Sequence, residues 1–414
     1  MNQSQAQNKI TKIIAEEIQD SHGNPTIKVT IWSGDISDSF SVPSGASTGA
    51  HEAHELRDED GKGVKKAIEN INKIIAPVLI GQDVLAQEEI DEIMIELDGT
   101  PNKDNLGGNS MIGVSVACAK VAARVSKMET FKYLQTLSAI KPSRPTPHLF
   151  MNLLEGGKHT KGKLAFQEYL LVSDTDNIRE AVDFGVKVQN SLKEMIRKEL
   201  GEESTVLGDE GGFATKINNI RKPLEFLVNA IKENNLEGKV RLSLDVAASS
   251  FYSNGMYKVD GKFVSKEGML SIYDSLVKEF NLFSIEDPFD EEDFDSFKRL
   301  RSLIYCEAKE IFMVGDDLTV SNKMLLEKAI ENGSVNAIII KPNQIGTLSE
   351  TLETMKLARE NNIELIVSHR GEETNDDFIA DLAYAYGCFG LKAGSPLKPE
   401  RRLKYDRLIK ISGM

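Results

Sequence analysis

The stretch Ala337-Ile338-Ile339-Ile340-Lys341-Pro342 sets the pattern from which the fold can be inferred. Four consecutive apolar residues are typical of a strand buried on both faces, and here they stop abruptly at a lysine. Because Pro342 biases the residue before it towards extended geometry, we expect Lys341 at the very end of this strand. A solvated loop lysine is the alternative interpretation, and the buried run before it disfavours that alternative.

The same pattern recurs along the second part of the chain, where short apolar runs end at a polar residue and an amphipathic helical segment follows. The further runs are residues 240–244 before Asp245, 282–285 before Glu286, 311–314 before Asp316, and 363–367 before His369. Successive run ends are about 25 to 40 residues apart, the length of a strand, a crossover helix and two loops. This predicts a parallel sheet in a closed β/α barrel, with the chemistry at the carboxyl ends of its strands. An open doubly wound sheet is the alternative architecture.

The first third of the chain has a different pattern. Residues 26–31 alternate polar and apolar side chains like a half-buried antiparallel strand, and residues 39–42 can continue that sheet. Residues 64–75 and 111–122 repeat apolar side chains at spacings of three and four, which indicates amphipathic helices. These elements together predict an α+β module.

A cluster of prolines separates the two patterns. Three of them fall within residues 141–148, where fixed φ angles and missing N–H donors oppose both helix and central strand. We therefore predict a smaller α+β N-terminal capping domain over residues 1–140, and an α/β domain, the β/α barrel, over residues 146–414.

Composition excludes several classes of protein. The 414 residues, 40% of them hydrophobic, can bury a large core. Lys plus Arg number 50 against 64 Asp plus Glu, and the net charge of −14 repels nucleic-acid phosphates and anionic lipid headgroups. We therefore expect neither nucleic acid nor a membrane as a partner. The lack of an apolar leader and three scattered cysteines predict a cytoplasmic protein; the cysteines are Cys118, Cys306 and Cys388.

Three of the predicted strand ends carry carboxylates. Because a barrel points Asp245, Glu286 and Asp316 at one cavity, they cannot all stay ionised and unpaired. A hard divalent cation resolves this conflict, and magnesium is the natural candidate. We expect Lys341, beside a dication and another cation such as Lys392, to have a lowered pKa and to act as a base. A metal and a lysine base indicate a lyase or isomerase that removes a proton next to a carboxylate, although any single acid can instead cap a helix.

The glycine-rich segment Gly208-Asp209-Glu210-Gly211-Gly212 is a further candidate site element. Its glycines let the backbone fold closely around a site and present Glu210. A plain turn explains the spacing equally well.

Seven segments of the chain occur together in an order that resembles a known family. They are residues 20–26 (DSHGNPT), 44–49 (SGASTG), 208–213 (GDEGGF), 284–287 (SIED), 315–318 (GDDL), Lys341 with 343–347 (NQIGT), and 368–370 (SHR). The chain thereby resembles the enolases, the phosphopyruvate hydratases of glycolysis, over about residues 8 to 411. The resemblance implies an enolase-type TIM barrel preceded by a smaller N-terminal domain.

The resemblance also implies the roles of residues that bind metal and move protons. Asp245, Glu286 and Asp316 correspond to ligands of a first magnesium ion. Ser47 corresponds to a residue that closes over the site, contacts the substrate and ligates a second magnesium ion shared with the phosphate. Lys341 then takes the C2 proton of 2-phosphoglycerate.

The departing hydroxyl and the rest of the substrate have counterparts as well. By the same resemblance, Glu210 protonates the C3 hydroxyl, giving phosphoenolpyruvate and water, and Glu168 lies beside it. Two neighbouring carboxylates raise one pKa, as a general acid requires. The remaining substrate-binding residues are His159, His369, Lys392 and Arg370, whose forked donors grip phosphate.

Four features depart from the family pattern. Gly371-Glu372 replaces the usual Ser-Gly, which removes a hydroxyl expected near the phosphate and adds a carboxylate. Glu155 stands in place of the usual Asn, and the neighbouring loop is then expected to differ. His22 replaces an Arg, and the chain stops at Met414; both changes bear on the surface through which the family dimerises. We expect a homodimer.

The predicted activity is magnesium-dependent, reversible dehydration of 2-phosphoglycerate in glycolysis and gluconeogenesis. One alternative is another enolase-superfamily barrel enzyme that removes a proton beside the carboxylate of an unphosphorylated acid, which the loss of the hydroxyl at Gly371 favours. A non-catalytic binding or scaffold protein is the second alternative. It predicts decay among the titratable site residues, and the sequence shows none.

Overall fold

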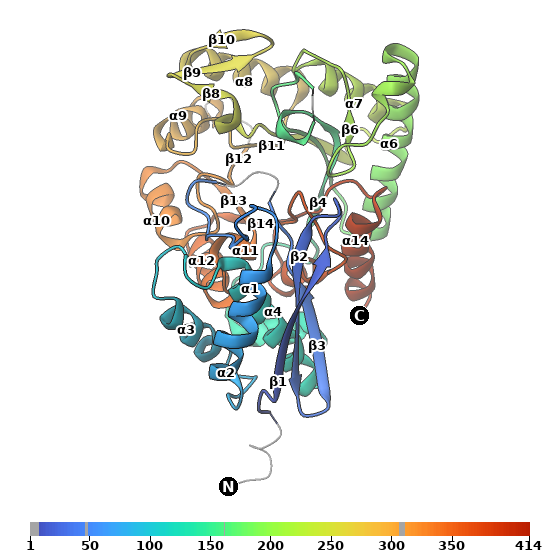
Figure 1. The fold of residues 1–414 in the computed structure, drawn as a ribbon. Coiled ribbons are helices and arrows are strands. Elements are labelled where there is room, and N and C mark those ends of the chain that lie inside the picture. The colour runs from blue at the N-terminus through green and yellow to red at the C-terminus, as the bar shows by residue number, and fades with distance from the viewer. Residues whose placement is uncertain (1–7, 46–48, 161, 306–310) are drawn as a thin grey trace.

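The computed structural model describes residues 8–45, 49–160, 162–305 and 311–414. Ser47 and Cys306, both singled out above, lie outside these residues. The N-terminal part contains an antiparallel sheet in the order β1-β2-β3 (Figure 1). Its strands are β1 (Lys12–Gln19), β2 (Pro25–Ser33) and β3 (Ile36–Ser41). Its helices are α1 (Lys65–Glu69), the π-helix η1 (Asn70–Ile75), α2 (Ala76–Leu79), α3 (Gln87–Asp98), α4 (Gly108–Val125) and α5 (Thr130–Leu137).

The long helix α4 forms the core of this part by packing on β2 and β3. Alternate side chains of β2, Ile27, Val29 and Ile31, are fully buried beneath it. A Cβ atom at Gly113 of α4 would lie 2.8 Å from Cγ2 of Val29, so glycine is required for this close approach. The alternating strand is confirmed, and residues 65–75 and 111–122 are helical as predicted. The prediction of a single buried face is wrong for α4, because every residue from Gly108 to Ala123 except Lys120 is buried.

Eight strands of the second part close into a barrel, because β15 pairs with β4. In chain order they are β4 (His148–Glu155), β5 (Glu168–Ser173), β7 (Val240–Asp245), β11 (Ser284–Glu286), β12 (Phe312–Gly315), β13 (Ala337–Ile340), β14 (Glu364–Ser368) and β15 (Gly390–Lys392). The closing pair excludes the open doubly wound sheet and confirms the predicted barrel.

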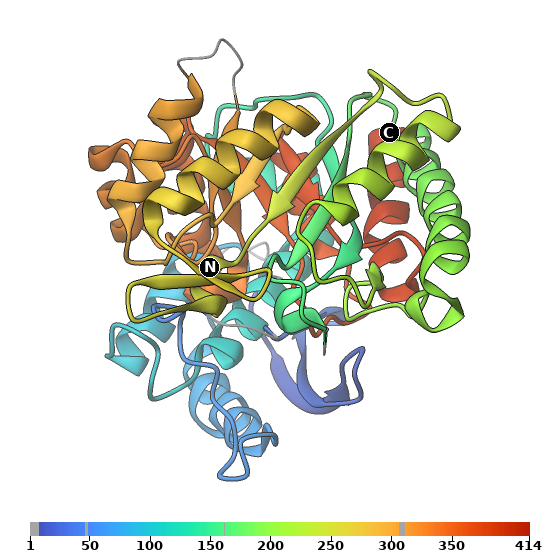
Figure 2. The same ribbon diagram turned by 90° about the horizontal axis from the view of Figure 1, so that it is seen from above.

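Helices surround the strands, as the view from above shows (Figure 2). They are α6 (Ile178–Leu200), α7 (Lys222–Glu233), α8 (Lys266–Phe280), α9 (Phe294–Tyr305), α10 (Lys323–Asn332), α11 (Pro342–Ile345), α12 (Leu348–Glu360), α13 (Phe378–Ala385) and α14 (Pro399–Ser412). The short strands β6 (Phe213–Ala214), β8 (Tyr252–Ser253), β9 (Met256–Val259) and β10 (Lys262–Val264) complete the fold. A search of the described helices finds none with the length and apolar character that a bilayer crossing requires.

The prediction of an entirely parallel sheet is wrong at one strand. β5 runs antiparallel to both of its neighbours, β4 and β7. Of the connection between β4 and β5, the described residues contain only the short 3-10 helix η2 (Gly157–His159) and no crossover helix, so the chain turns back at the same end of the barrel. As a result Glu168, the first residue of β5, is the register partner of Asp245, the last residue of β7. The reversal therefore places Glu168 at the rim where the other strands end.

The barrel interior is packed with apolar side chains below that rim. Ala337 and Ile339 of β13 belong to the interior cluster, whereas Ile338 and Ile340 face the surrounding helices. Because side chains alternate along a strand, Lys341 continues the inward-facing set. The N-terminal part lies over the same rim, where the backbone of Ala53 donates to Gln344 O at 2.7 Å.

Candidate active site

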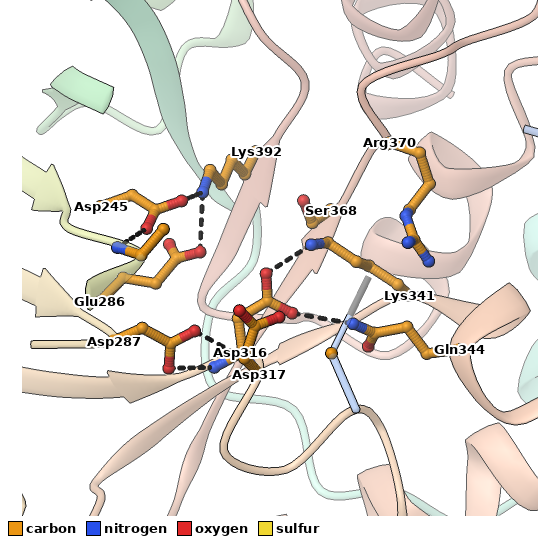
Figure 3. Close-up of polar contacts among 12 residues, drawn as sticks. Asp245, Glu286, Asp287, Asp316, Asp317, Lys341, Gln344, Ser368, Arg370 and Lys392 are labelled. Atoms are coloured by element: carbon orange, nitrogen blue, oxygen red, sulfur yellow. Dashed lines mark hydrogen bonds and ion pairs between the residues drawn. The ribbon is translucent and has the colours of Figure 1, made fainter. Parts of the chain in front are cut away.

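The inward-facing positions at the strand ends gather charged side chains into one buried cluster. Lys392 ends β15, and its Nζ donates to Asp245 Oδ2 and Glu286 Oε1, each at 2.8 Å (Figure 3). The same Nζ lies 3.3 Å from Glu168 Oε1. Burial opposes the charge on Lys392, but the surrounding carboxylates raise its pKa well above the ordinary value. Lys392 is therefore a permanent cation that links three neighbouring strands.

Lys341 lies across the cluster from Lys392 and donates to Asp316 Oδ2 (Figure 3). Gln344 fixes the other oxygen of that carboxylate, since its Nε2 donates to Oδ1 at 3.0 Å. Burial favours the neutral amine, but the Asp316 carboxylate outweighs it and raises the pKa of Lys341 above its ordinary value. The expected lowering of this pKa was for an amine beside a bound dication and stays a prediction; among the protein groups alone, the neighbouring Asp316 carboxylate dominates.

Asp287 is a site residue that the sequence reasoning did not single out. Its left-handed backbone, with φ of 43°, turns the carboxylate back under the next strand end. There Oδ1 accepts the N–H of Asp316 at 3.0 Å and Oδ2 accepts that of Asp317 at 2.7 Å. Burial and Asp317 raise the pKa of Asp287 well above its usual range, and burial and Asp316 raise that of Asp317 to about 7. The local signal was a second acid directly after Glu286.

The structure groups the predicted metal ligands differently from the expectation. Among the described residues, Asp316 lies close enough to share one ion with Asp287 and Asp317, and not with Asp245 or Glu286. Asp245 and Glu286 are instead bridged by Lys392. A cavity of about 30 Å³ lies among these groups, room for about one water molecule or ion.

A second cluster, built around Glu210, lines the same cavity. His369 Nε2 lies 3.3 Å from Glu210 Oε2, and His159 Nε2 lies 3.9 Å from Oε1. Glu168 and His159 are near enough to Glu210 to share an ion with it. Burial and Glu210 raise the pKa of Glu168 well above its ordinary value. For Glu210, burial opposes the charge, but the two imidazoles outweigh it and hold the pKa low. These surroundings favour the protonated form at Glu168 and the ionised form at Glu210.

Glu155 holds the glycine-rich loop that presents Glu210. Its Oε1 accepts the backbone N–H groups of Glu210 at 3.0 Å and Gly212 at 2.6 Å. The carboxyl group packs so tightly that a Cβ at Gly208 would lie 2.0 Å from Oε2. Burial and Glu210 raise the pKa of Glu155 well above its ordinary value, which favours its neutral form. Glu155 therefore offers a carbonyl oxygen as the acceptor, as the family's Asn can, on a side chain that is one methylene longer.

We expect Glu155→Gln to retain a kcat close to that of the unaltered protein, because a neutral amide keeps the carbonyl acceptor. Glu155→Ala leaves two buried N–H groups unpaired and frees the loop, so kcat falls by more than about tenfold. Steady-state kinetics of the two variants, with thermal unfolding as the control for folding, makes the comparison. Equal loss in both variants would mean that Glu155 acts through its negative charge instead.

Arg370 joins the rim of the barrel to the N-terminal part. Its Nη2 pairs with Glu52 Oε2 at 2.8 Å and its Nη1 donates to Asn343 Oδ1 at 3.0 Å. Glu52, which the sequence reasoning missed, gives no local signal because its partner is 318 residues away. The added carboxylate of Glu372 points away from the cavity and accepts from Asn24 Nδ2 at 3.0 Å. Of the described residues that depart from the family pattern, namely His22, Glu155, Gly371 and Glu372, only Gly371 lines the cavity.

Glu373 forms a buried ion pair with Lys404 behind this rim, at 2.7 Å. Burial opposes its charge, but Lys404 and Arg401 outweigh it and hold the pKa of Glu373 below 4.5. The pair therefore contributes stability above pH 4.5 that is lost as the pH falls through the lower folded-state pKa. We expect Glu373→Gln to unfold more easily at pH 7 by about 3 to 5 kcal/mol.

The same substitution should flatten the acid side of the stability profile, because one group that must be protonated on unfolding is gone. Urea unfolding at several pH values, from pH 7 down to the lowest pH at which the protein is still folded, measures both effects. An acid slope unchanged by Glu373→Gln would show that this pair does not couple folding to pH.

Comparison with known proteins matches both parts of the chain. The family model described as Enolase, N-terminal domain, matches residues 10–134, and that described as Enolase, C-terminal TIM barrel domain, matches residues 143–413. A protein named enolase from Methanocaldococcus jannaschii is 44% identical over 409 residues, which cover 97% of this chain and 95% of that protein. Enolases from Methanothrix thermoacetophila and Mastigamoeba balamuthi are 42% and 41% identical, each over 97% of this chain and 95% of the relative.

Proposed function

This chain belongs to the enolase family, and from that premise we propose how its residues carry out the family's reaction. The protein is a lyase, a phosphopyruvate hydratase that interconverts 2-phosphoglycerate and phosphoenolpyruvate. The observation that carries the mechanism is the placement of Lys341 and the Glu168–Glu210 pair around one cavity, with a row of carboxylates at its edge.

The acidic edge of the cavity fits the divalent cation that the family implies. Its donors are carboxylate oxygens, which hard cations prefer, and they outnumber the two lysine ammonium groups. Glu168 Oε2 is buried and has no hydrogen-bond partner among the described residues. We assign the ion as magnesium, two per site, with Asp245, Glu286 and Asp316 holding the first and Ser47 contributing to the second. Bound magnesium would stabilise the negative charge that develops on the substrate carboxylate.

Lys341 is the base that removes the C2 proton. Its amine must be neutral to accept that proton, and the cationic neighbours Lys392 and Arg370 both lower its pKa. Asp316 opposes them by raising the pKa of Lys341. A positive charge bound to this carboxylate on the side away from the amine would weaken that effect and favour the neutral amine. The C2–H electron pair then stays on the substrate as the proton moves to Nζ.

The Glu168–Glu210 pair is the acid that completes the elimination. The proton that the pair shares is favoured on Glu168 and passes to the neighbouring Glu210, which delivers it to the C3 hydroxyl. The hydroxyl leaves as water with the C3–O electron pair, while the electron pair left at C2 forms the C2–C3 double bond. In the reverse direction the same pair removes a proton from the attacking water. One proton is taken at Lys341 and one is given at Glu210, so the reaction is balanced.

The remaining charged groups bind the substrate. His159 and His369 flank Glu210 and offer N–H donors to the C3 side. Lys392 lies beside the carboxylate ligands, and Arg370 offers a guanidinium at the rim, where its present partner is Glu52. Phosphate binding exchanges one anionic partner of Arg370 for another.

The proposal includes a cytoplasmic homodimer, which rests on the family resemblance. Sedimentation of the purified chain should give the mass of two chains. A monomer mass at micromolar concentration would remove the dimer from the proposal and leave the chemistry intact.

Mixing the purified protein with 2-phosphoglycerate and Mg²⁺ tests the function directly, because the enol product absorbs in the ultraviolet. We expect an absorbance rise that depends on Mg²⁺ and is absent with the unphosphorylated acid, glycerate. Turnover of glycerate instead would favour the alternative activity on an unphosphorylated acid. The missing hydroxyl at Gly371 is the observation that supports this alternative. No signal with either substrate would overturn the proposal.

A further inference from the structure

Arg401, in the first turn of α14, is a buried cation that joins two segments of the active site. Its side chain is fully buried. Nη1 donates to the carbonyl oxygen of Arg370 at 2.5 Å, and Nη2 donates to that of Gly371 at 2.6 Å and of Asp209 at 3.3 Å. One guanidinium therefore holds both the segment after β14 and the loop that carries Glu210.

The fourth contact of Arg401 has a chemical consequence for His369. Arg401 Nη1 lies 2.6 Å from His369 Nδ1. A guanidinium has only donors, so Nδ1 must be the acceptor and carry no proton. The neutral ring then carries its proton on Nε2, the nitrogen that lies 3.3 Å from Glu210 Oε2.

We propose that Arg401 is a positioning residue that fixes His369 as the Nε2–H tautomer and so aims a hydrogen-bond donor into the cavity at Glu210 and the departing hydroxyl. This inference rests on the proposed function, in which His369 binds the substrate beside the general acid. Within the described part of the chain, Nε2 has no aligned hydrogen-bond acceptor of its own, so its N–H is available to a bound molecule.

The surrounding charges agree with a neutral ring. Burial lowers the pKa of His369 to about 4, and Arg401 acts in the same direction, against the opposing effect of Glu210 and Glu373. With Nδ1 engaged by a donor, protonation of the ring would bring two N–H groups face to face. The ring is thus kept neutral and its single proton is kept on one side.

The tautomer can be read on the unaltered enzyme by ¹⁵N NMR of histidine-labelled protein. The chain has six histidines, and a His369→Asn sample identifies the signals of His369. We expect a protonated Nε2 and an unprotonated Nδ1 at pH 7. A protonated Nδ1 would overturn the inference without any bearing on whether the protein is a phosphopyruvate hydratase.

Variants test whether the tautomer matters for turnover. We expect Arg401→Met to lower kcat by about hundredfold and to let the proton redistribute between the two ring nitrogens. Arg401→Lys keeps one donor near Nδ1, so it should retain the Nε2–H signal and recover part of kcat even if it is less stable. Arg402→Met, at the next position of the same helix, where the side chain pairs with Asp406, is the matched control and should change neither property.

Two outcomes would contradict this role. One is an Arg401→Met protein that folds and retains the Nε2–H tautomer. The other is an Arg401→Lys protein that retains the tautomer but whose kcat falls as far as that of Arg401→Met, since the loss would then be structural. If Arg401→Met does not fold, the ¹⁵N signals of His369 in the unaltered enzyme and in Arg401→Lys still show whether Arg401 fixes the tautomer.

Discussion

Lys341→Ala should lower kcat by about 10² to 10⁴-fold, the contribution of a positioned general base. The fold should survive, because Asp316, the partner of Lys341, keeps its hydrogen bond from Gln344 at 3.0 Å. KM should change less than kcat, since the amine acts on the reacting carbon and other cations bind the charged ends of the substrate. The ultraviolet assay gives both constants.

The matched control is Lys323→Ala, which removes an exposed lysine that pairs with Glu353 on the outer surface of the barrel. It should leave kcat unchanged. If Lys341→Ala retained more than about a tenth of the activity, another group would have to be the base, since a general base contributes about 10²-fold or more.

Removal of divalent cations should abolish turnover, and added Mg²⁺ should restore it. The acids at the cavity edge leave an excess of buried negative charge that the two lysines do not neutralise, and burial and Asp245 raise the pKa of Glu286 well above its ordinary value for that reason. A cation that binds only the folded protein also stabilises it, by about 2.7 kcal/mol at a concentration of 100 times its dissociation constant. Thermal unfolding with and without Mg²⁺ therefore measures binding without relying on activity.

Glu286→Gln should shrink this thermal shift and weaken the dependence of kcat on Mg²⁺. The matched control is Glu353→Gln, a removal of one negative charge from the exposed face of α12, which should leave both unchanged. A thermal shift of the same size in Glu286→Gln would place the ion elsewhere. Full activity in the presence of a chelator would contradict the metal assignment altogether.

The barrel could be predicted because its signal is repeated along the chain. Five apolar runs each end at a charged or polar residue, and alternation along a strand then places those residues inside the closed barrel. Lys341, Asp245, Glu286, Asp316 and His369 all come from such runs, and the structure brings them to one rim. The roles assigned to them remain proposals.

Other features could not be read because they depend on contacts between distant segments. The reversal of β5 follows from how its connection to β4 folds. No periodic pattern in the sequence therefore predicts that Glu168 lies opposite Asp245. Glu52 reaches Arg370 only because the N-terminal part covers the rim. The raised pKa of Lys341 depends on which neighbour lies nearest to its amine, and that is a matter of geometry.

Exchange of the C2 hydrogen of 2-phosphoglycerate with deuterium from the solvent tests most directly whether Lys341 breaks the C–H bond. Nuclear magnetic resonance can follow this exchange in Glu210→Gln, where the proton can leave C2 but the hydroxyl cannot depart. We expect exchange in Glu210→Gln and none in Lys341→Ala or in the double variant. Exchange that persists without Lys341 would contradict the account.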